Sequence, residues 1–327
     1  MNLYSRTVIE SGSITHVTKG RIINEMIDTL FIVFGSEELV IFSCDSKNET
    51  LIEMNRLKAF SHILAICCIK PLGFTEDLLA IISDSGSLSF IVFNDYNNYD
   101  VILNIPLTRS GCRRSSLGHL MIAEPNGRGL FLSALEGEKR FILTAKGKKK
   151  DQILSFAAFS IDCNDYVVID GAAFDVEFQN PLFAILEKKS EFGGDHHLSI
   201  YSVELGIKQI VILKRVHLDS IFYGVLGINY DKNESSIILY GETSLELLNQ
   251  KGEKKQLINI PKRIDYEKGD VNPIVLADIC YNSGNIYCQN IEGDMFKLIQ
   301  DDNKNYIIDY FVTTKKSSHL IKLSKIW

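Results

Sequence analysis

The sequence predicts an all-β fold: a single seven-bladed β-propeller of the WD40-like type. Three observations predict it. The apolar segments are short and rich in β-branched and aromatic residues, which favours strands over helices. Clusters of Gly, Asp, Asn and Ser break these segments into strand–turn–strand units. The units recur at roughly 40–50 residues, which is the period of propeller blades.

Five hairpins stand out along the chain. Their turns are centred near Ser36, Ser85, Asn126, Glu242 and Glu292. The third contains the dipeptide Asn-Gly, the strongest short hairpin signal, between two apolar strands. The long interval between the third and fourth turns holds further strand-like segments and has room for one or two more units. We therefore expect six or seven blades, and seven would give about 47 residues per blade.

Little else interrupts this pattern. The segment from Glu49 to Phe60 has apolar spacing for a helical turn or two, but the spacing does not persist. No linker, low-complexity stretch or change of composition marks a domain boundary. Residues 1–327 are therefore expected to form one domain.

Composition limits the class of protein. The net charge is −6, with 46% hydrophobic and 23% charged residues, so the chain is neither a disordered tail nor a basic nucleic-acid coat. The seven cysteines are an odd number and fit buried, reduced side chains better than a disulfide framework. No apolar run approaches a membrane span, and the N-terminus lacks a signal-peptide pattern. We expect a cytosolic or nuclear protein with no membrane association.

The sequence predicts no catalytic residues, no cofactor and no metal site, since none of the common catalytic or nucleotide-binding patterns occurs in it. The pair His196-His197 is interpreted as a solvated loop rather than a zinc site. Cys280 and Cys288 are candidates to face each other across a hairpin, with core packing the favoured alternative. The basic run Lys146–Lys150 is interpreted as a solvated loop rather than a phosphate contact.

One segment is harder to assign. Between two predicted strands, the sequence places two arginines beside a cysteine and a glycine, in the run Ser110, Gly111, Cys112, Arg113 and Arg114. Arginine is enriched at interface hot spots and suits bidentate pairing with carboxylates. The run is therefore a candidate partner-binding or structural motif, and the packing residues Gly111 and Cys112 favour the structural role.

This run and the residues that follow it also resemble a known protein family. "SGCRR", followed by "EPNGRGLFLSALEGEKRFIL" at Glu124–Leu143, resembles the N-terminal propeller of the splicing factor 3b subunit 3 family. Downstream, "DVEFQNPLFAILE" at Asp175–Glu187, "LSIYSVELGI" at Leu198–Ile207 and "EGDMFKLI" at Glu292–Ile299 also resemble that family. The same superfamily includes the large propeller subunits of the mRNA cleavage and polyadenylation factor and of the UV-damaged-DNA-binding complex.

The sequence departs from the family pattern at three places. It has Leu117 where the family has proline, Glu124-Pro125 where an Asp-Pro turn is usual, and Gln179 where an acidic residue is typical. Family members continue through further propellers, so the resemblance implies that residues 1–327 are an N-terminal propeller truncated before them, with an incomplete last blade.

The resemblance implies a function. It predicts a non-enzymatic scaffold subunit of the spliceosomal SF3b complex of the U2-type small nuclear ribonucleoprotein, acting in pre-mRNA splicing in the nucleus. The expected partners are the HEAT-repeat subunit and the small subunit of that complex, with nucleic acid contacted only indirectly. The alternative is a propeller adaptor of the DNA-damage-binding/ubiquitin-ligase or mRNA 3′-end cleavage branch. An enzyme using a propeller channel is the third hypothesis, and it would need convergent carboxylates or histidines.

Overall fold

The structure is a computed structural model that describes residues 14–45, 50–59, 61–107, 119–135, 138–144, 156–162, 166–177, 179–189, 195–231, 234–260, 273–280, 284–291 and 293–312. Every regular element in these ranges is a β-strand, which confirms the all-β class. The segment in which the spacing allowed a helical turn is the strand β4 (Thr50–Lys58).

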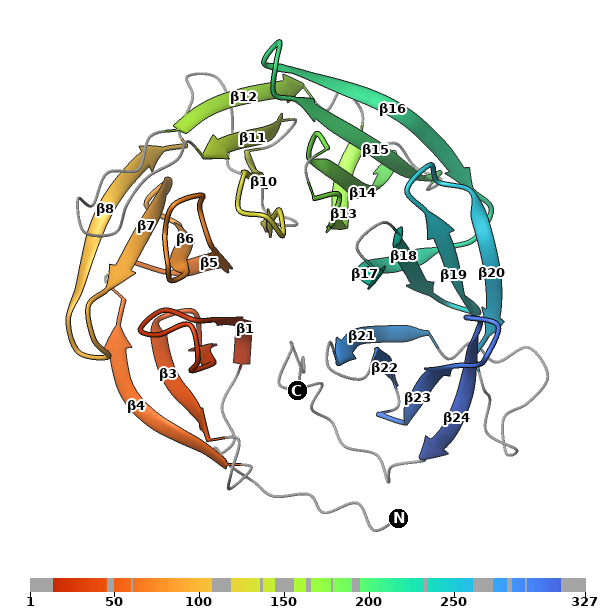
Figure 1. Ribbon diagram of the computed structural model, residues 1–327, viewed down its shortest axis with the longest axis horizontal. Coiled ribbons are helices and arrows are strands. Elements are labelled where there is room, and N and C mark those ends of the chain that lie inside the picture. Colours follow the sequence, from red (N-terminus) through yellow and green to blue (C-terminus); the bar gives the residue numbers. More distant parts are fainter. Residues whose placement is uncertain are drawn as a thin grey trace. The chain divides into compact units, whose positions relative to one another are not determined.

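The strands form four-stranded antiparallel sheets, each from four strands consecutive in the sequence (Figure 1). Sheet 1 contains β1 (Ile14–Gly20), β2 (Thr29–Phe34), β3 (Glu38–Asp45) and β4. Sheet 2 contains β5 (Ile63–Ile69), β6 (Leu78–Ser83), β7 (Ser87–Phe93) and β8 (Tyr99–Pro106). Sheet 3 contains β9 (Leu120–Ala123), β10 (Gly129–Leu135), β11 (Glu138–Thr144) and β12 (Phe156–Asp162).

The remaining three sheets follow the same order. Sheet 4 contains β13 (Tyr166–Phe174), β14 (Leu182–Lys189), β15 (His196–Glu204) and β16 (Gln209–Leu218). Sheet 5 contains β17 (Phe222–Asp231), β18 (Glu234–Gly241), β19 (Ser244–Asn249) and β20 (Lys254–Asn259). Sheet 6 contains β21 (Ile274–Cys280), β22 (Asn285–Asn290), β23 (Met295–Gln300) and β24 (Tyr306–Val312).

The prediction of seven blades is wrong, because the described residues contain six four-stranded sheets. The prediction of an incomplete last blade is also wrong, since sheet 6 has all four strands. The error has a local cause. The turn at Asn126 joins the first and second strands of its sheet, whereas the other four recognised turns join the second and third. Counting it as equivalent to the others leaves apparent room for an extra sheet.

Sheets 1 and 2 belong to one compact unit of the chain, and sheets 3 to 6 belong to a second. The single domain expected over residues 1–327 stays a prediction. Within each unit, consecutive sheets bury a shared apolar core. Sheets 1 and 2 share one core, and the second unit has three: between sheets 3 and 4, sheets 4 and 5, and sheets 5 and 6.

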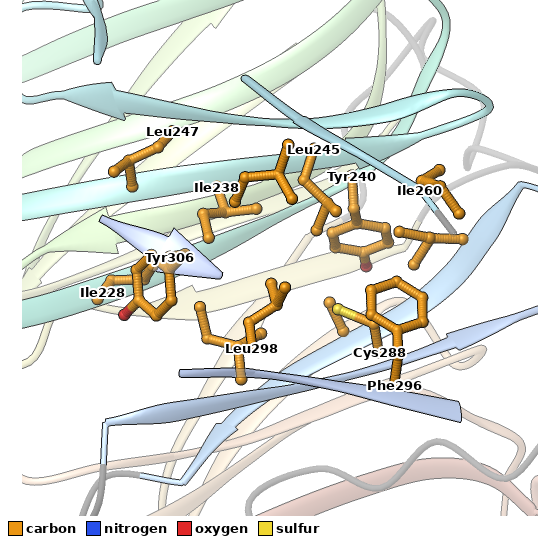
Figure 2. Close-up of a cluster of buried hydrophobic side chains, with 14 residues drawn as sticks. Ile228, Ile238, Tyr240, Leu245, Leu247, Ile260, Cys288, Phe296, Leu298 and Tyr306 are labelled. Carbon is orange, nitrogen blue, oxygen red and sulfur yellow. The ribbon is translucent and has the colours of Figure 1, made fainter. Parts of the chain in front are cut away.

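The core between sheets 5 and 6 illustrates how the strands pack (Figure 2). Ile238 and Leu245 project from sheet 5, and Phe296 and Leu298 project from sheet 6. All four side chains are at most 1% exposed. Because side chains alternate across a strand, every second residue of an inner strand reaches this layer. The aliphatic and aromatic side chains of these strands fill the layer between the two sheets.

The tight turns have the backbone that their residues predict. Gly35 and Ser36 both have positive φ angles, 57° and 65°, between β2 and β3. Two consecutive positive φ angles define the hairpin turn whose twist matches that of the flanking strands. The Glu37 amide closes the turn by donating to the Phe34 carbonyl 3.2 Å away.

The outermost strands carry a repeated irregularity. In five of the six sheets, the fourth strand contains one extra residue relative to the third, at Met54, Ile102, Leu213, Lys255 and Asp309. The exception is β12, which pairs with β11 without a register shift. A bulge bends and twists an edge strand and breaks its ladder of unpaired backbone groups, which discourages pairing with another strand. These five edges are therefore poor templates for strand addition.

Candidate functional site

The motif singled out by the sequence, Ser110–Arg114, lies outside the described residues, as does the basic run Lys146–Lys150. Other segments that carry the resemblance are described. Two of them, the turn after β9 and the turn after β13, lie in the same compact unit and form the candidate site.

The turn between β9 and β10 is organised around a buried ion pair. Glu124 is 1% exposed and Arg128 is 8% exposed. The Arg128 guanidinium lies 2.5 Å from the Glu124 carboxylate, and the Arg128 backbone amide donates to the same carboxylate at 3.0 Å. Gly127 has a φ of 69° and closes the turn with a hydrogen bond from its amide to the Glu124 carbonyl. Within "EPNGR", the buried carboxylate of Glu124 and the buried guanidinium of Arg128 thus pair with each other.

This turn is joined to the turn between β13 and β14. Arg128 donates from its guanidinium to the backbone carbonyl of Gln179. Asn126 donates from its side-chain amide to the Asp175 carboxylate at 3.0 Å and to the Glu124 carboxylate at 3.1 Å. We call Glu124, Asn126, Arg128, Asp175 and Gln179 the turn latch. Two segments that resemble the family therefore meet, and their polar residues bind sheet 3 to sheet 4.

Sheet 5 also contacts the turn between β13 and β14. The hydroxyl of Ser235, on β18, donates to the backbone carbonyl of Asp175. The amide of Asn180 donates to the Glu204 carboxylate, which fixes the end of β15. Gln179 takes part in the latch through its backbone carbonyl rather than its side chain. The contact with Arg128 therefore does not depend on the identity of the side chain at position 179.

A second buried polar cluster lies between sheets 3 and 4, beside their shared apolar core. Glu187, on β14, is fully buried and lies 2.5 Å from the ammonium of Lys139, on β11, which is 1% exposed. Ser199 donates to the Glu187 carboxylate at 2.7 Å and Tyr201 donates at 3.2 Å. Arg215, on β16, contributes a further cation 3.7 Å away. We call these five residues the Glu187 cluster.

The cluster satisfies the hydrogen-bonding capacity of a carboxylate that is fully removed from water, which is the condition for burying it at tolerable cost. Burial, together with the neighbouring Glu187 carboxylate, raises the pKa of Tyr201. The hydroxyl therefore stays protonated and serves as a donor. Sequence reasoning missed this site because nothing in the sequence around Lys139 or Glu187 shows that the two residues pair.

The Glu187 cluster extends outward through Arg215. Its guanidinium stacks over the Tyr166 ring, 4.6 Å from the centroid, and its Nε donates to Ser199 at 3.0 Å. The rings of His197 and Tyr166 are 5.4 Å apart, and those of His197 and His217 are 5.2 Å apart. Burial lowers the pKa of His197, and the nearby His217 and Arg215 add to the effect. Arg215 is thus held by its neighbours rather than free to reorient.

Sheets 4 and 5 are also connected near their first strands. Asp170, on β13, accepts hydrogen bonds from the Val225 amide at 2.9 Å and from the Tyr240 hydroxyl. Burial and the Asp170 carboxylate raise the pKa of Tyr240 well above its ordinary value. Gly224 lies against this contact, because a Cβ there would come within 2.0 Å of the Tyr240 oxygen. Only glycine leaves room for the tyrosine.

The remaining sequence-based interpretations have mixed outcomes. The solvated loop expected at His196-His197 is wrong, because both residues belong to β15 and His196 is 6% exposed. No group of three or more potential metal ligands occurs among the residues that the structure describes. Cys280 and Cys288 are not opposite each other, since Cys288 lies across from Ala277 in the ladder and Cys280 lies across from Asn285. Cys288 is buried in the core between sheets 5 and 6, and burial raises the pKa of its thiol (Figure 2).

The three polar sites have one chemical property in common. In each of them, at least one hydrogen bond or ion pair joins residues of adjacent sheets: Asn126 to Asp175, Lys139 to Glu187, and the Val225 amide to Asp170. Within the ranges that the structure describes, no helix has the length and apolar character needed to span a membrane.

Comparison with known proteins agrees with these observations. A protein-family model described as "RSE1/DDB1/CPSF1 first beta-propeller" matches residues 13–325. Among curated proteins, the splicing factor 3B subunit 3 of Drosophila melanogaster is 22% identical over 99% of this chain and 28% of its own length. The pre-mRNA-splicing factor RSE1 of Saccharomyces cerevisiae is 28% identical over 74% of this chain and 20% of its own length.

A third relative, the pre-mRNA-splicing factor RSE1 of Kluyveromyces lactis, is 29% identical over 53% of this chain and 14% of its own length. The chain thus spans less than a third of the length of these relatives. The family match, by contrast, covers nearly all of the chain and includes both turns of the latch. The chain therefore belongs to the family of the first β-propeller of RSE1, DDB1 and CPSF1.

Proposed function

We propose that the chain acts as a non-enzymatic scaffold of the spliceosomal SF3b complex of the U2-type small nuclear ribonucleoprotein, in pre-mRNA splicing. The observation that carries this proposal is the similarity to a splicing factor 3B subunit 3 over 99% of the chain. The relatives named above are all splicing factors, which favours this branch of the family over the adaptor of the DNA-damage or 3′-end cleavage branch.

The polar sites support a scaffold mechanism. The turn latch, the Glu187 cluster and the Asp170–Tyr240 contact join neighbouring sheets by hydrogen bonds in which buried groups have partners. Rigid sheets hold their connecting loops in fixed positions, and partner surfaces are recognised by the shape and chemistry of such loops. The net charge of −6 favours protein partners over direct contact with RNA phosphates.

The proposed partners are the HEAT-repeat subunit and the small subunit of the complex, and the proposed location is the nucleus. The direct test is a pull-down of the purified chain with the recombinant HEAT-repeat subunit, alone and with the small subunit. We expect retention at micromolar concentration, as for a standard-sized interface. No retention under either condition would contradict the proposal for this chain.

Affinity purification from native nuclear extract separates the two branches of the family. Recovery of spliceosomal proteins would support the SF3b assignment. Recovery of cullin-type ligase subunits or of cleavage and polyadenylation proteins would replace it with the adaptor function.

The segment Ser110–Arg114 is proposed to contribute to this scaffold, with a structural role favoured over a partner contact. The double variant Arg113→Ala/Arg114→Ala distinguishes the two roles. A structural role predicts a lower free energy of unfolding, measured in urea, with retention in the pull-down reduced only as far as the fold is lost. Unchanged stability with lost retention would instead assign the arginines to the interface.

A further inference from the structure

The outer strand of sheet 4 has an unusual surface. From Leu205 to Leu218 the sequence contains no aspartate or glutamate, although the whole chain has a net charge of −6. The same stretch exposes four aliphatic side chains to solvent. They are Leu205 at 37%, Ile207 at 70%, Ile212 at 44% and Leu213 at 55% exposed. We call these four residues, with Lys208 and Lys214, the β16 surface.

The bulge in β16 produces part of this exposure. Ile200 pairs with Lys214 and Tyr201 pairs with Ile212, so Leu213 is the extra residue. Ile212 and Leu213 are consecutive and both exposed, although successive side chains of a regular strand point to opposite faces. Two aliphatic side chains that are consecutive in the sequence are therefore both open to solvent on the outermost strand of the sheet.

The lysines of the β16 surface are available for a partner. Within the part of the chain that the structure describes, neither Lys208 nor Lys214 forms an ion pair, whereas the nearby Arg215 is bound to Glu187 and Ser199. The stem of Lys214 lies 3.8 Å from the position of a Cβ at Gly252, in the β19–β20 turn. The lysine is thus supported from one side while its strand faces solvent.

Two other outer strands, β4 and β20, have exposed aliphatic residues but do not combine these features. On β4, Ile52 is 49% exposed, but the charges beside it are neutralised by the pairing of Arg56 with Glu38 and Glu53. On β20, Leu257 is 50% exposed, and Lys254 is paired with Glu246 at 2.5 Å. Unpaired cations beside adjacent exposed aliphatic residues thus distinguish β16 from these two strands.

We propose that the β16 surface is a docking site for an acidic, amphipathic helical segment of a partner protein. The lysines select carboxylates by charge complementarity, and the aliphatic residues select an apolar stripe. The bulge at Leu213 interrupts the strand edge, so an added β-strand would not fit along it and a helix that makes contact through side chains would. The inference goes beyond the proposed function, because it rests on the β16 surface alone and not on the identity of any subunit of the complex.

RNA is the other class of ligand that a basic surface attracts. Two unpaired lysines offer few phosphate contacts, and none of the exposed apolar residues of the surface is aromatic, so bases have no ring to stack on. The aliphatic character of the surface therefore favours protein.

The test uses the full chain and fluorescence polarisation of labelled probes. The first probe is a designed helix of about 20 residues with leucines at i, i+3, i+4 and i+7 and glutamates beside them. The second replaces every glutamate by lysine, and the third is a single-stranded oligouridylate of the same length. We expect the acidic helix to bind with a Kd of about 10 μM and the other two to bind at least about tenfold more weakly.

Three variants locate the binding. Leu213→Ser and Lys214→Glu are each expected to weaken binding of the acidic helix by about tenfold, and Lys214→Glu should also reduce its salt dependence. Ile52→Ser, which removes a similarly exposed residue from β4, is the matched control and should leave the Kd unchanged. Urea unfolding of each variant confirms that the fold is retained.

Three results would overturn the proposal: equal binding of the acidic and basic helices, unchanged affinity in both β16 variants, or tighter binding of the oligouridylate than of the acidic helix. The last result would assign the surface to nucleic acid.

Discussion

The side-chain amide of Asn126 lies 3.0 Å from the Asp175 carboxylate, and this hydrogen bond joins the first turn of sheet 3 to the first turn of sheet 4. The two residues are 49 positions apart in the chain. Both belong to segments that resemble the same family, so the resemblance includes two turns that contact each other in the folded protein. The stability of the protein should depend on this contact and on the other buried polar sites that join adjacent sheets.

Breaking the buried pair of the turn latch should destabilise the protein strongly. Arg128→Ala leaves the Glu124 carboxylate buried without its cation, and the loss of one partner of a buried pair typically costs about 3–5 kcal/mol. The measurement is the free energy of unfolding in urea. Arg56→Ala, which breaks an exposed pair with Glu38 and Glu53, is the control and should cost less than about 1 kcal/mol. Equal losses in the two variants would show that the latch is not a buried structural pair.

The protein should tolerate the replacement of both members of the Lys139–Glu187 ion pair better than the loss of Glu187 alone. Glu187→Ala removes the buried carboxylate that is paired with the Lys139 ammonium, and we expect a loss of about 3–5 kcal/mol. The double variant Lys139→Met/Glu187→Leu replaces both charges by apolar groups, and it should recover much of that stability. Calorimetric or urea unfolding of the single and double variants measures the difference. A double variant as unstable as Glu187→Ala would show that hydrogen bonds from Ser199 and Tyr201, rather than the ion pair, dominate.

Gly224 should not tolerate a side chain. In Gly224→Ala the new Cβ would lie 2.0 Å from the Tyr240 oxygen and 2.7 Å from the Asp170 carboxylate, so the contact between sheets 4 and 5 must shift. Overpacking of this kind costs about 1–3 kcal/mol. Gly206→Ala is the matched control, because a Cβ at that exposed position would have no atom within 4 Å. A thermal unfolding midpoint that is lowered in both variants alike would refute the steric explanation.

Mild acid should destabilise the fold through histidines that are buried or half-buried. Burial lowers the pKa of His119, His196 and His197 below the ordinary value of 6.5. The unfolded chain therefore binds more protons than the folded chain just below pH 6.5, and stability falls as the pH decreases from there. We expect a lower unfolding midpoint at a pH of about 5.5 than at about 7.5, on either side of the ordinary histidine pKa.

His196→Gln removes one of these imidazoles and should reduce the difference between the two pH values. His62→Gln removes an exposed imidazole and is the control. A midpoint that does not change between the two pH values in the unmodified chain would contradict the prediction.

The sequence predicted the strands and turns well because both depend on local properties. Apolar alternation and turn residues at Ser36, Ser85 and Asn126 mark hairpins wherever they occur. The number of sheets could not be derived in the same way. A turn between first and second strands has the same local signature as a turn between second and third, so the pattern around Asn126 does not show which two strands it joins.

The candidate sites depended even more on the fold. Glu124, Arg128 and Asp175 drew attention through the resemblance, but their sequence does not show that they pair. Lys139 is flanked by Glu138 and Arg140, and only its position on β11 opposite Glu187 makes it a buried structural cation. The sequence by itself determined the all-β class, the hairpins and the family, since each is encoded in short segments. The tertiary structure alone decided which charges are buried and which remain exposed on β16, because burial depends on residues that are distant in the chain.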